Sequence, residues 1–166
     1  MREPIRDHSR LEHMLHAIDN IMTYTNGKDA QDLEDDSMLF FAVVKNIEII
    51  GEAAFKLTKA FCKKHQETPW ESIAKMRHVL VHDYYQIKSK EVWNVIAQDL
   101  APLRKQISDY LVNINWEEWE KNEQAIAESA VHKNIIQTAK RMLTKGYELK
   151  EISDITGLTI DEISDL

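Results

Sequence analysis

The chain of 166 residues contains one cysteine, four glycines and three prolines. The single cysteine, Cys62, excludes an intramolecular disulfide framework and a cysteine-rich zinc site. So little glycine and proline leaves little material for turns, which favours long helices over a many-stranded sandwich. The sequence also lacks an N-terminal apolar signal segment and any run of about 18 apolar residues. We therefore expect a cytoplasmic protein without membrane spans.

The chain also has fewer positive than negative charges, and its formal net charge is −7. An acidic chain argues against a nucleic-acid partner. The charge is uneven, however. Residues 1–115 carry 15 Lys and Arg against 17 Asp and Glu, whereas residues 116–166 carry 6 against 11. The main body is close to neutral, and the acidity is concentrated in the tail.

What the sequence has is apolar residues at helical spacing. One stripe runs from Leu11 to Met22 and should stop at Gly27, and a second runs from Phe40 to Phe61 after an acidic loop. Thr68-Pro69-Trp70-Glu71 has the pattern of a capping box that opens a third helix. These segments predict the first three helices of an antiparallel bundle.

A fourth stripe runs from Val92 to Leu111, with Ser89 as its expected cap and Pro102 as an expected kink or weak point. Antiparallel helices joined by short loops form a bundle. We therefore predict an all-α fold, a bundle of four to five helices over residues 1–115, with a helical extension over residues 116–166.

In the extension, we expect a helix from Trp116 to Lys145, ended by Gly146, and a last short helix opened by Thr159 and Glu162. This ending resembles a helix-turn-helix. Its candidate recognition helix carries three acidic residues and no basic one, although phosphate contacts supply most of the affinity of DNA binders. DNA binding is therefore an unfavoured interpretation, and packing or interaction is the favoured one.

The best functional lead is the spacing of Arg77, His82 and Tyr84. Arginine binds phosphate through a planar fork of donors, histidine moves a proton near neutral pH, and tyrosine offers a hydroxyl. Arg77 and Tyr84 share a helix face, but His82 points about 140° away from Arg77 on an ideal helix. Either the helix loosens near Val81, or a second copy of the chain supplies the missing residues in a two-fold dimer.

Other interpretations of these residues stay open. Arg77 could anchor an ion pair, His82 could fill a polar gap, and Tyr84 could be a half-buried aromatic residue. His78 and His82, four residues apart, suggest a metal site, but two histidines without a clear third ligand make a poor one.

Several blocks of the sequence, in order, resemble the HepT-like family of the HEPN superfamily. They are Arg10–Ile18, Asn46–Ala53, Pro69–Arg77, Val81–Tyr84 and Val92–Ile96, and the match covers roughly residues 5–112. His78 is a departure, since many relatives carry Asn or another small polar residue there.

The resemblance implies a metal-independent ribonuclease toxin without a cofactor, whose antitoxin is a minimal nucleotidyltransferase that attaches AMP to the motif tyrosine. It implies that Arg77 and His82 are catalytic and that Tyr84 is modified, with Tyr85 as the neighbouring candidate. Glu48 and Glu52 are expected to support the cleft and orient Arg77, with His78 as a third possible support. A packed or solvated helix face is an equal interpretation of the two glutamates.

The sequence therefore leaves two possible functions. The first is an RNA-cleaving homodimer paired with the nucleotidyltransferase. The second is a non-catalytic HEPN module that binds the same partner.

Overall fold

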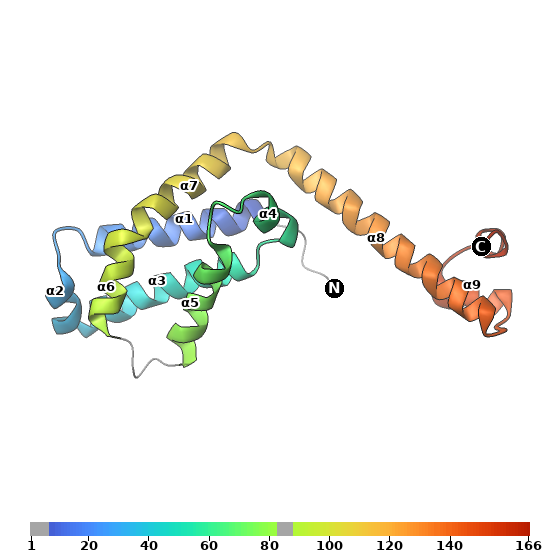
Figure 1. The fold of residues 1–166 in the computed structure, drawn as a ribbon, viewed down its shortest axis with the longest axis horizontal. Coiled ribbons are helices and arrows are strands. Elements are labelled where there is room, and N and C mark those ends of the chain that lie inside the picture. The colour runs from blue at the N-terminus through green and yellow to red at the C-terminus, as the bar shows by residue number, and fades with distance from the viewer. Residues whose placement is uncertain (1–6, 83–87) are drawn as a thin grey trace. The chain divides into compact units, whose positions relative to one another are not determined.

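The computed structural model describes residues 7–82 and 88–166, and of residues 78–82 it describes the backbone alone. Within these ranges the chain forms ten helices and no strand, which confirms the predicted all-α fold (Figure 1). The helices divide into two compact units, Met1–Trp116 and Glu117–Leu166.

Four of the seven described helices of the first unit build its bundle. α1 (Asp7–Tyr24) and α3 (Ser37–Phe55) pack antiparallel, α5 (Trp70–His82) packs on α3, and α7 (Leu100–Asn113) packs on α1 (Figure 1). Each helix turns one apolar stripe inward, because its apolar residues recur every three or four positions. The fully buried members of the core are mostly aliphatic: Leu11, Met14, Ile18, Ile21, Val43, Ile47, Ile50, Phe61 and Ile107.

The acidic loop expected between the first two stripes is in part a helix, α2 (Ala30–Asp35). The side chain of Asp29 accepts hydrogen bonds from the backbone N–H groups of Gln31 and Asp32, and Asp32 bonds back to the N–H of Asp29. This reciprocal capping satisfies the first donors of a short helix. Asp29 and Asp32 therefore cap a helix in a segment where the low helix propensity of aspartate favours a loop.

The second stripe does not form one helix as far as Phe61. α3 ends at Phe55, and α4 (Lys59–Lys64) begins after a cap at Thr58. The buried carboxylate of Asp7 fixes this break, because it accepts hydrogen bonds from the Thr58 N–H at 2.8 Å and from the Thr58 hydroxyl at 2.6 Å. A contact across 51 residues of sequence cannot be seen in local spacing.

The predicted capping box at Thr68 is wrong. The Thr68 hydroxyl lies 2.7 Å from the hydroxyl of Tyr110 on α7 instead of capping α5. Tyr110 in turn donates to Glu67 at 2.7 Å. Burial is the main reason that the pKa of Tyr110 is raised to about 12, so this phenol stays neutral and holds the start of α5 against α7.

The last stripe of the bundle is divided between α6 (Ser89–Gln98) and α7, with the break at Asp99. The predicted weak point near Pro102 is therefore present. The proline lies in the first turn of α7, where the lack of an N–H removes no hydrogen bond within the helix. Ser89 is the first residue of α6 and makes no capping hydrogen bond, so the predicted cap is wrong.

The second unit contains α8 (Trp116–Thr144), α9 (Leu149–Thr156) and α10 (Ile160–Ser164). The predicted end of α8 at Gly146 is confirmed, and this glycine has a φ of +82°. The predicted cap of α10 is also confirmed, because the Thr159 N–H donates to Glu162 at 2.8 Å and the Thr159 hydroxyl accepts from the Glu162 N–H. The core of this unit is small and consists of Ala139, Ile152, Leu158 and Ile163.

Among the described residues, no helix is long and apolar enough to cross a membrane.

Candidate active site

Arg77 lies on α5 where that helix comes closest to α3. A Cβ atom added to Gly51 of α3 would lie 2.6 Å from the Cβ of Arg77 and 3.2 Å from the carbonyl oxygen of Ile73. Real Cβ atoms do not approach each other so closely. Gly51 therefore brings the two helices together at the level of Arg77.

Glu52, the next residue of α3, contacts the guanidinium of Arg77. Its Oε2 atom lies 2.7 Å from Arg77 Nε, and its Oε1 atom lies 3.2 Å from Lys56 Nζ. Glu52 Oε2 is shielded from solvent and makes no hydrogen bond of good geometry among the described residues. Its contact with Arg77 is therefore an ion pair, defined by the short distance between the two charged groups. Both side chains are partly exposed, so the pair orients the arginine more than it stabilises the fold.

The contact uses the Nε edge of Arg77, and the described residues supply no further partner for the guanidinium. The terminal Nη groups thus remain available to a ligand. An arginine held at one edge and open at the other suits a phosphate, which accepts two parallel hydrogen bonds from a guanidinium.

Glu48 does not contact Arg77. It accepts a hydrogen bond from Lys45 at 2.9 Å, one turn back on α3. Of the two glutamates singled out in the sequence, the structure therefore brings Glu52 to the arginine and leaves Glu48 in a local ion pair.

Glu52 lies in the middle of an exposed apolar face of α3. At about 100° per residue, nine residues of the helix and its cap, Glu52 included, lie within about 60° of Glu52. Phe41 is 62% exposed, Phe55 is 68% exposed and Met38 is 81% exposed. Apart from the small Ser37 at the start of the helix, the set, which we call the α3 face, is Met38, Phe41, Lys45, Glu48, Ile49, Glu52, Phe55 and Lys56. Large apolar side chains in a row on one face indicate a contact surface.

The other predicted site residues are only partly described. α5 is helical through His82, so the helix does not loosen near Val81, and Arg77 and His82 lie on one continuous helix. The side chains of His78 and His82 are outside the described residues, as are Tyr84 and Tyr85 entirely. Their roles, and the metal interpretation of the two histidines, stay predictions.

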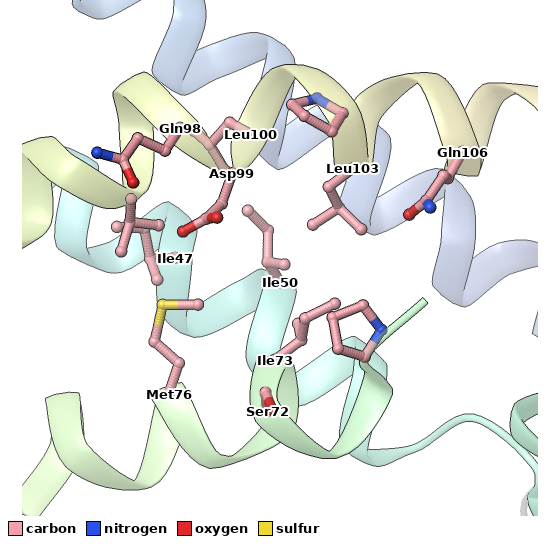
Figure 2. Close-up of a pocket in the computed structure, with 13 residues that line it drawn as sticks. Ile47, Ile50, Ser72, Ile73, Met76, Gln98, Asp99, Leu100, Leu103 and Gln106 are labelled. Atoms are coloured by element: carbon pink, nitrogen blue, oxygen red, sulfur yellow. The ribbon is translucent and has the colours of Figure 1, made fainter. Parts of the chain in front are cut away.

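A pocket of about 320 Å³ lies elsewhere in the bundle, between α5 and α7 with α3 as its floor. Its walls include Ile47, Ile50, Ile73 and Met76, and Figure 2 shows the carboxylate of Asp99 directed over the same space. Ile50 points roughly 160° away from Glu52 on α3. The pocket is therefore separate from the Arg77 site, and an apolar space beside a carboxylate does not suit phosphate. No sequence signal marked it, because its lining comes from four helices.

Gly51→Ala is expected to destabilise the protein by about 1–2 kcal/mol, because the new methyl group must displace the backbone of α5 at Arg77. Helix propensity alone would favour alanine over glycine by about 1 kcal/mol. Chemical denaturation of both proteins measures the difference in free energy of unfolding. A more stable variant would show that the close approach of α3 and α5 does not exist.

The comparisons with known proteins agree with the geometry. A family model described as ribonuclease HepT-like matches residues 14–110. A protein of Caldanaerobacter subterraneus named "Putative RNase" is 36% identical over 101 residues, which are 61% of this chain and 90% of that protein. A protein of Thermococcus cleftensis named "Probable ribonuclease HepT" is 33% identical over 94 residues, which are 57% of this chain and 86% of that protein.

A third relative differs in length. A protein of Methanocaldococcus jannaschii named "Gamma-glutamylcyclotransferase and putative RNase" is 35% identical over 97 residues, which are 58% of this chain but 44% of that protein. All three alignments leave about two fifths of this chain unmatched, and the family match ends at residue 110, before the second unit begins. No solved structure matches the chain at a significant level.

Proposed function

This chain belongs to the HepT-like ribonuclease family, and we propose that it cleaves RNA, without a metal ion, at a site built from Arg77 and His82. The observation that carries the proposal is the state of Arg77. Its guanidinium is held at one edge by Glu52 and is open at the other. Gly51 lets the backbone of α5 approach α3 at this residue, and the end of α5 bears the motif histidine.

The residues match the chemistry of RNA cleavage by its own 2′-hydroxyl. A base removes the proton of the 2′-hydroxyl, whose oxygen attacks the adjacent phosphorus while the bond from phosphorus to the 5′-oxygen breaks. An acid gives a proton to the leaving 5′-oxygen, so the products are a 2′,3′-cyclic phosphate and a 5′-hydroxyl. Histidine has an ordinary pKa of about 6.5 and serves either step, and arginine stabilises the charge that develops on the phosphate oxygens.

A homodimer would complete the site, because the motif supplies one histidine and the reaction uses both a base and an acid. The α3 face supports this step of the proposal. It exposes four large apolar side chains, and it carries Glu52, the residue that holds Arg77. Pairing of two α3 faces about a two-fold axis would bring two copies of Arg77 towards one cleft.

Phe41→Glu is expected to convert the dimer into a monomer, since a carboxylate would replace a large exposed apolar side chain of the contact surface. Light scattering after gel filtration gives the mass in solution. Val112→Glu is the matched control, because Val112 is 82% exposed on α7, outside the α3 face. A dimer that withstands Phe41→Glu would place the contact surface elsewhere.

The proposed partner is a minimal nucleotidyltransferase antitoxin that transfers AMP from ATP to the Tyr84 hydroxyl and releases pyrophosphate. An AMP group on Tyr84 would add a phosphate that competes with RNA for Arg77. The chain would then be a toxin of the cytoplasm that its partner holds inactive.

Mass spectrometry of the chain co-expressed with such a nucleotidyltransferase is expected to show the mass of one added AMP, located on Tyr84. Tyr84→Phe should remain unmodified, whereas Tyr85→Phe should be modified as fully as the wild type. Modification of Tyr85 in the wild type, or at a residue outside the motif, would refute the assignment.

Expression of the chain without its partner tests the proposed function as a whole. Wild type should arrest growth and degrade cellular RNA, and His82→Ala, expressed to the same level, should do neither. If both proteins leave growth and RNA intact, the alternative stands, namely a non-catalytic module that binds the nucleotidyltransferase.

A further inference from the structure

The pocket between α5 and α7 is large for a bundle of this size. The two helices are joined at one end, where the Thr68 hydroxyl lies 2.7 Å from that of Tyr110 and donates to Gln106 at 3.2 Å. Beyond this end, α5 packs on α3 and α7 packs on α1, and a volume of about 320 Å³ separates them. That volume holds about ten water molecules, at about 30 Å³ each. An apolar space of this size weakens the packing unless a ligand fills it.

The depth of the pocket is apolar. Five of its wall residues, contributed by α3, α5 and α7, are at most 8% exposed: Ile47, Ile50, Ile73, Leu100 and Leu103. Met76 of α5 adds its thioether, which faces the same space in Figure 2. Of the described residues that line the pocket, Asp99 alone is charged. The pocket therefore offers an apolar interior with a single negative group.

Asp99 precedes α7 but does not cap it. Two other aspartates in the same position, Asp29 before α2 and Asp36 before α3, accept hydrogen bonds from the first N–H groups of their helices and have extended backbones. The Asp99 side chain accepts no such bond, and its backbone is helical. Figure 2 shows its carboxylate directed over the pocket instead. Within the described part of the chain, no cation or donor contacts this carboxylate.

We propose that the pocket binds a small organic cation, an amine with an apolar body. The body would lie among Ile50, Ile73 and Leu103, and the ammonium group would contact the carboxylate of Asp99. Because Asp99 is exposed, the ammonium group stays at the mouth of the pocket, where it keeps part of its hydration. The volume lies at the lower end of the usual range for ligand pockets, about 300–1,000 Å³, which suits a body of one or two fused rings.

The charge of Asp99 selects among ligand classes. A carboxylate repels phosphates and carboxylic acids, and a neutral apolar ligand would leave it without a partner. An ammonium group satisfies it with a charge-assisted hydrogen bond, which is about twice as strong as a neutral one. The proposed site is independent of RNA cleavage, because it lies away from Arg77 and takes a ligand of opposite charge to RNA.

Three probes with one indole ring test the ligand class by isothermal titration calorimetry of the full chain. Tryptamine carries an ammonium group, tryptophol a hydroxyl and indole-3-propionate a carboxylate. Tryptamine should bind about tenfold more tightly than tryptophol, and indole-3-propionate should bind most weakly. Equal affinity for the three probes, or no binding of tryptamine, would overturn the proposal.

A variant of the carboxylate tests the role of Asp99. Asp99→Asn should lower the affinity for tryptamine to that for tryptophol and leave the affinity for tryptophol unchanged. Asp109→Asn is the matched control, because Asp109 is exposed on the same helix and lies outside the pocket. It should bind all three probes as the wild type does. A preference for tryptamine that survives in Asp99→Asn would place the cation elsewhere and overturn the proposal.

Nuclear magnetic resonance of methionine methyl groups tests the location. The ring current of the indole should shift the signal of Met76, which its absence from Met76→Leu identifies, and should leave the signal of Met38, 81% exposed on the α3 face, in place. A shift of Met38 without one of Met76 would contradict the assignment. Light scattering should give the same mass for Asp99→Asn and wild type. A lower mass for the variant would mean that a second copy of the chain, and not a small amine, occupies the pocket.

Discussion

Replacing Arg77 with alanine is expected to lower the rate of RNA cleavage by about 10²–10³-fold, the usual effect of removing one group that stabilises developing charge. Glu52 occupies the Nε edge of the Arg77 guanidinium, so we expect the Nη groups to contact the RNA phosphate. Arg77→Lys should recover little activity, because an ammonium group keeps the charge but loses the planar fork. Initial rates on a labelled RNA oligonucleotide measure the effect.

The control for Arg77 is another arginine of the same unit. Arg104 contacts Asp19 through Nε at 2.6 Å, and its exposure is close to that of Arg77. Arg104→Ala should therefore lower the stability no more than Arg77→Ala does, and it should leave cleavage unchanged. Equal loss of activity in both variants would mean that Arg77 supports the fold and does not contact RNA.

His82→Ala is expected to reduce cleavage by about 10²–10⁴-fold, the range for loss of a general acid or base. His82→Gln should be equally inactive, because an amide keeps hydrogen bonding but transfers no proton. If His82 of each copy supplies one of the two proton transfers, the wild-type rate should rise and then fall as pH increases through the ordinary pKa range of histidine.

His16 is the comparison residue for this experiment, since it is exposed on α1 away from the α3 face. His16→Ala should cleave at the wild-type rate. Full activity in His82→Ala, with the thermal stability of the wild type retained, would remove His82 from the mechanism.

The fold was predictable from the sequence where local signals decide it. Gly146 ends α8, and Thr159 with Glu162 starts α10, because capping depends on residues within one turn. Local sequence did not predict the helix ends where a residue far along the chain determines them. Asp7 reaches 51 positions along the chain to divide the second stripe at Thr58, and Tyr110 draws the Thr68 hydroxyl away from its cap.

The site was predictable to a similar degree. The sequence selected Arg77 and Glu52, and the structure places them together with Gly51 at the contact between α3 and α5. Helical spacing also predicts that Arg77 and His82 diverge, and α5 is continuous as far as His82. Spacing could not select Glu52 over Glu48, because the choice depends on where α5 crosses α3.

The most direct measurement is incubation of purified wild-type protein with RNA in excess chelator, followed by analysis of the ends of the products. Cleavage through Arg77 and His82 predicts undiminished activity in the chelator, with 2′,3′-cyclic phosphate and 5′-hydroxyl ends. Loss of cleavage that added metal restores, or products with 3′-hydroxyl and 5′-phosphate ends, would contradict it.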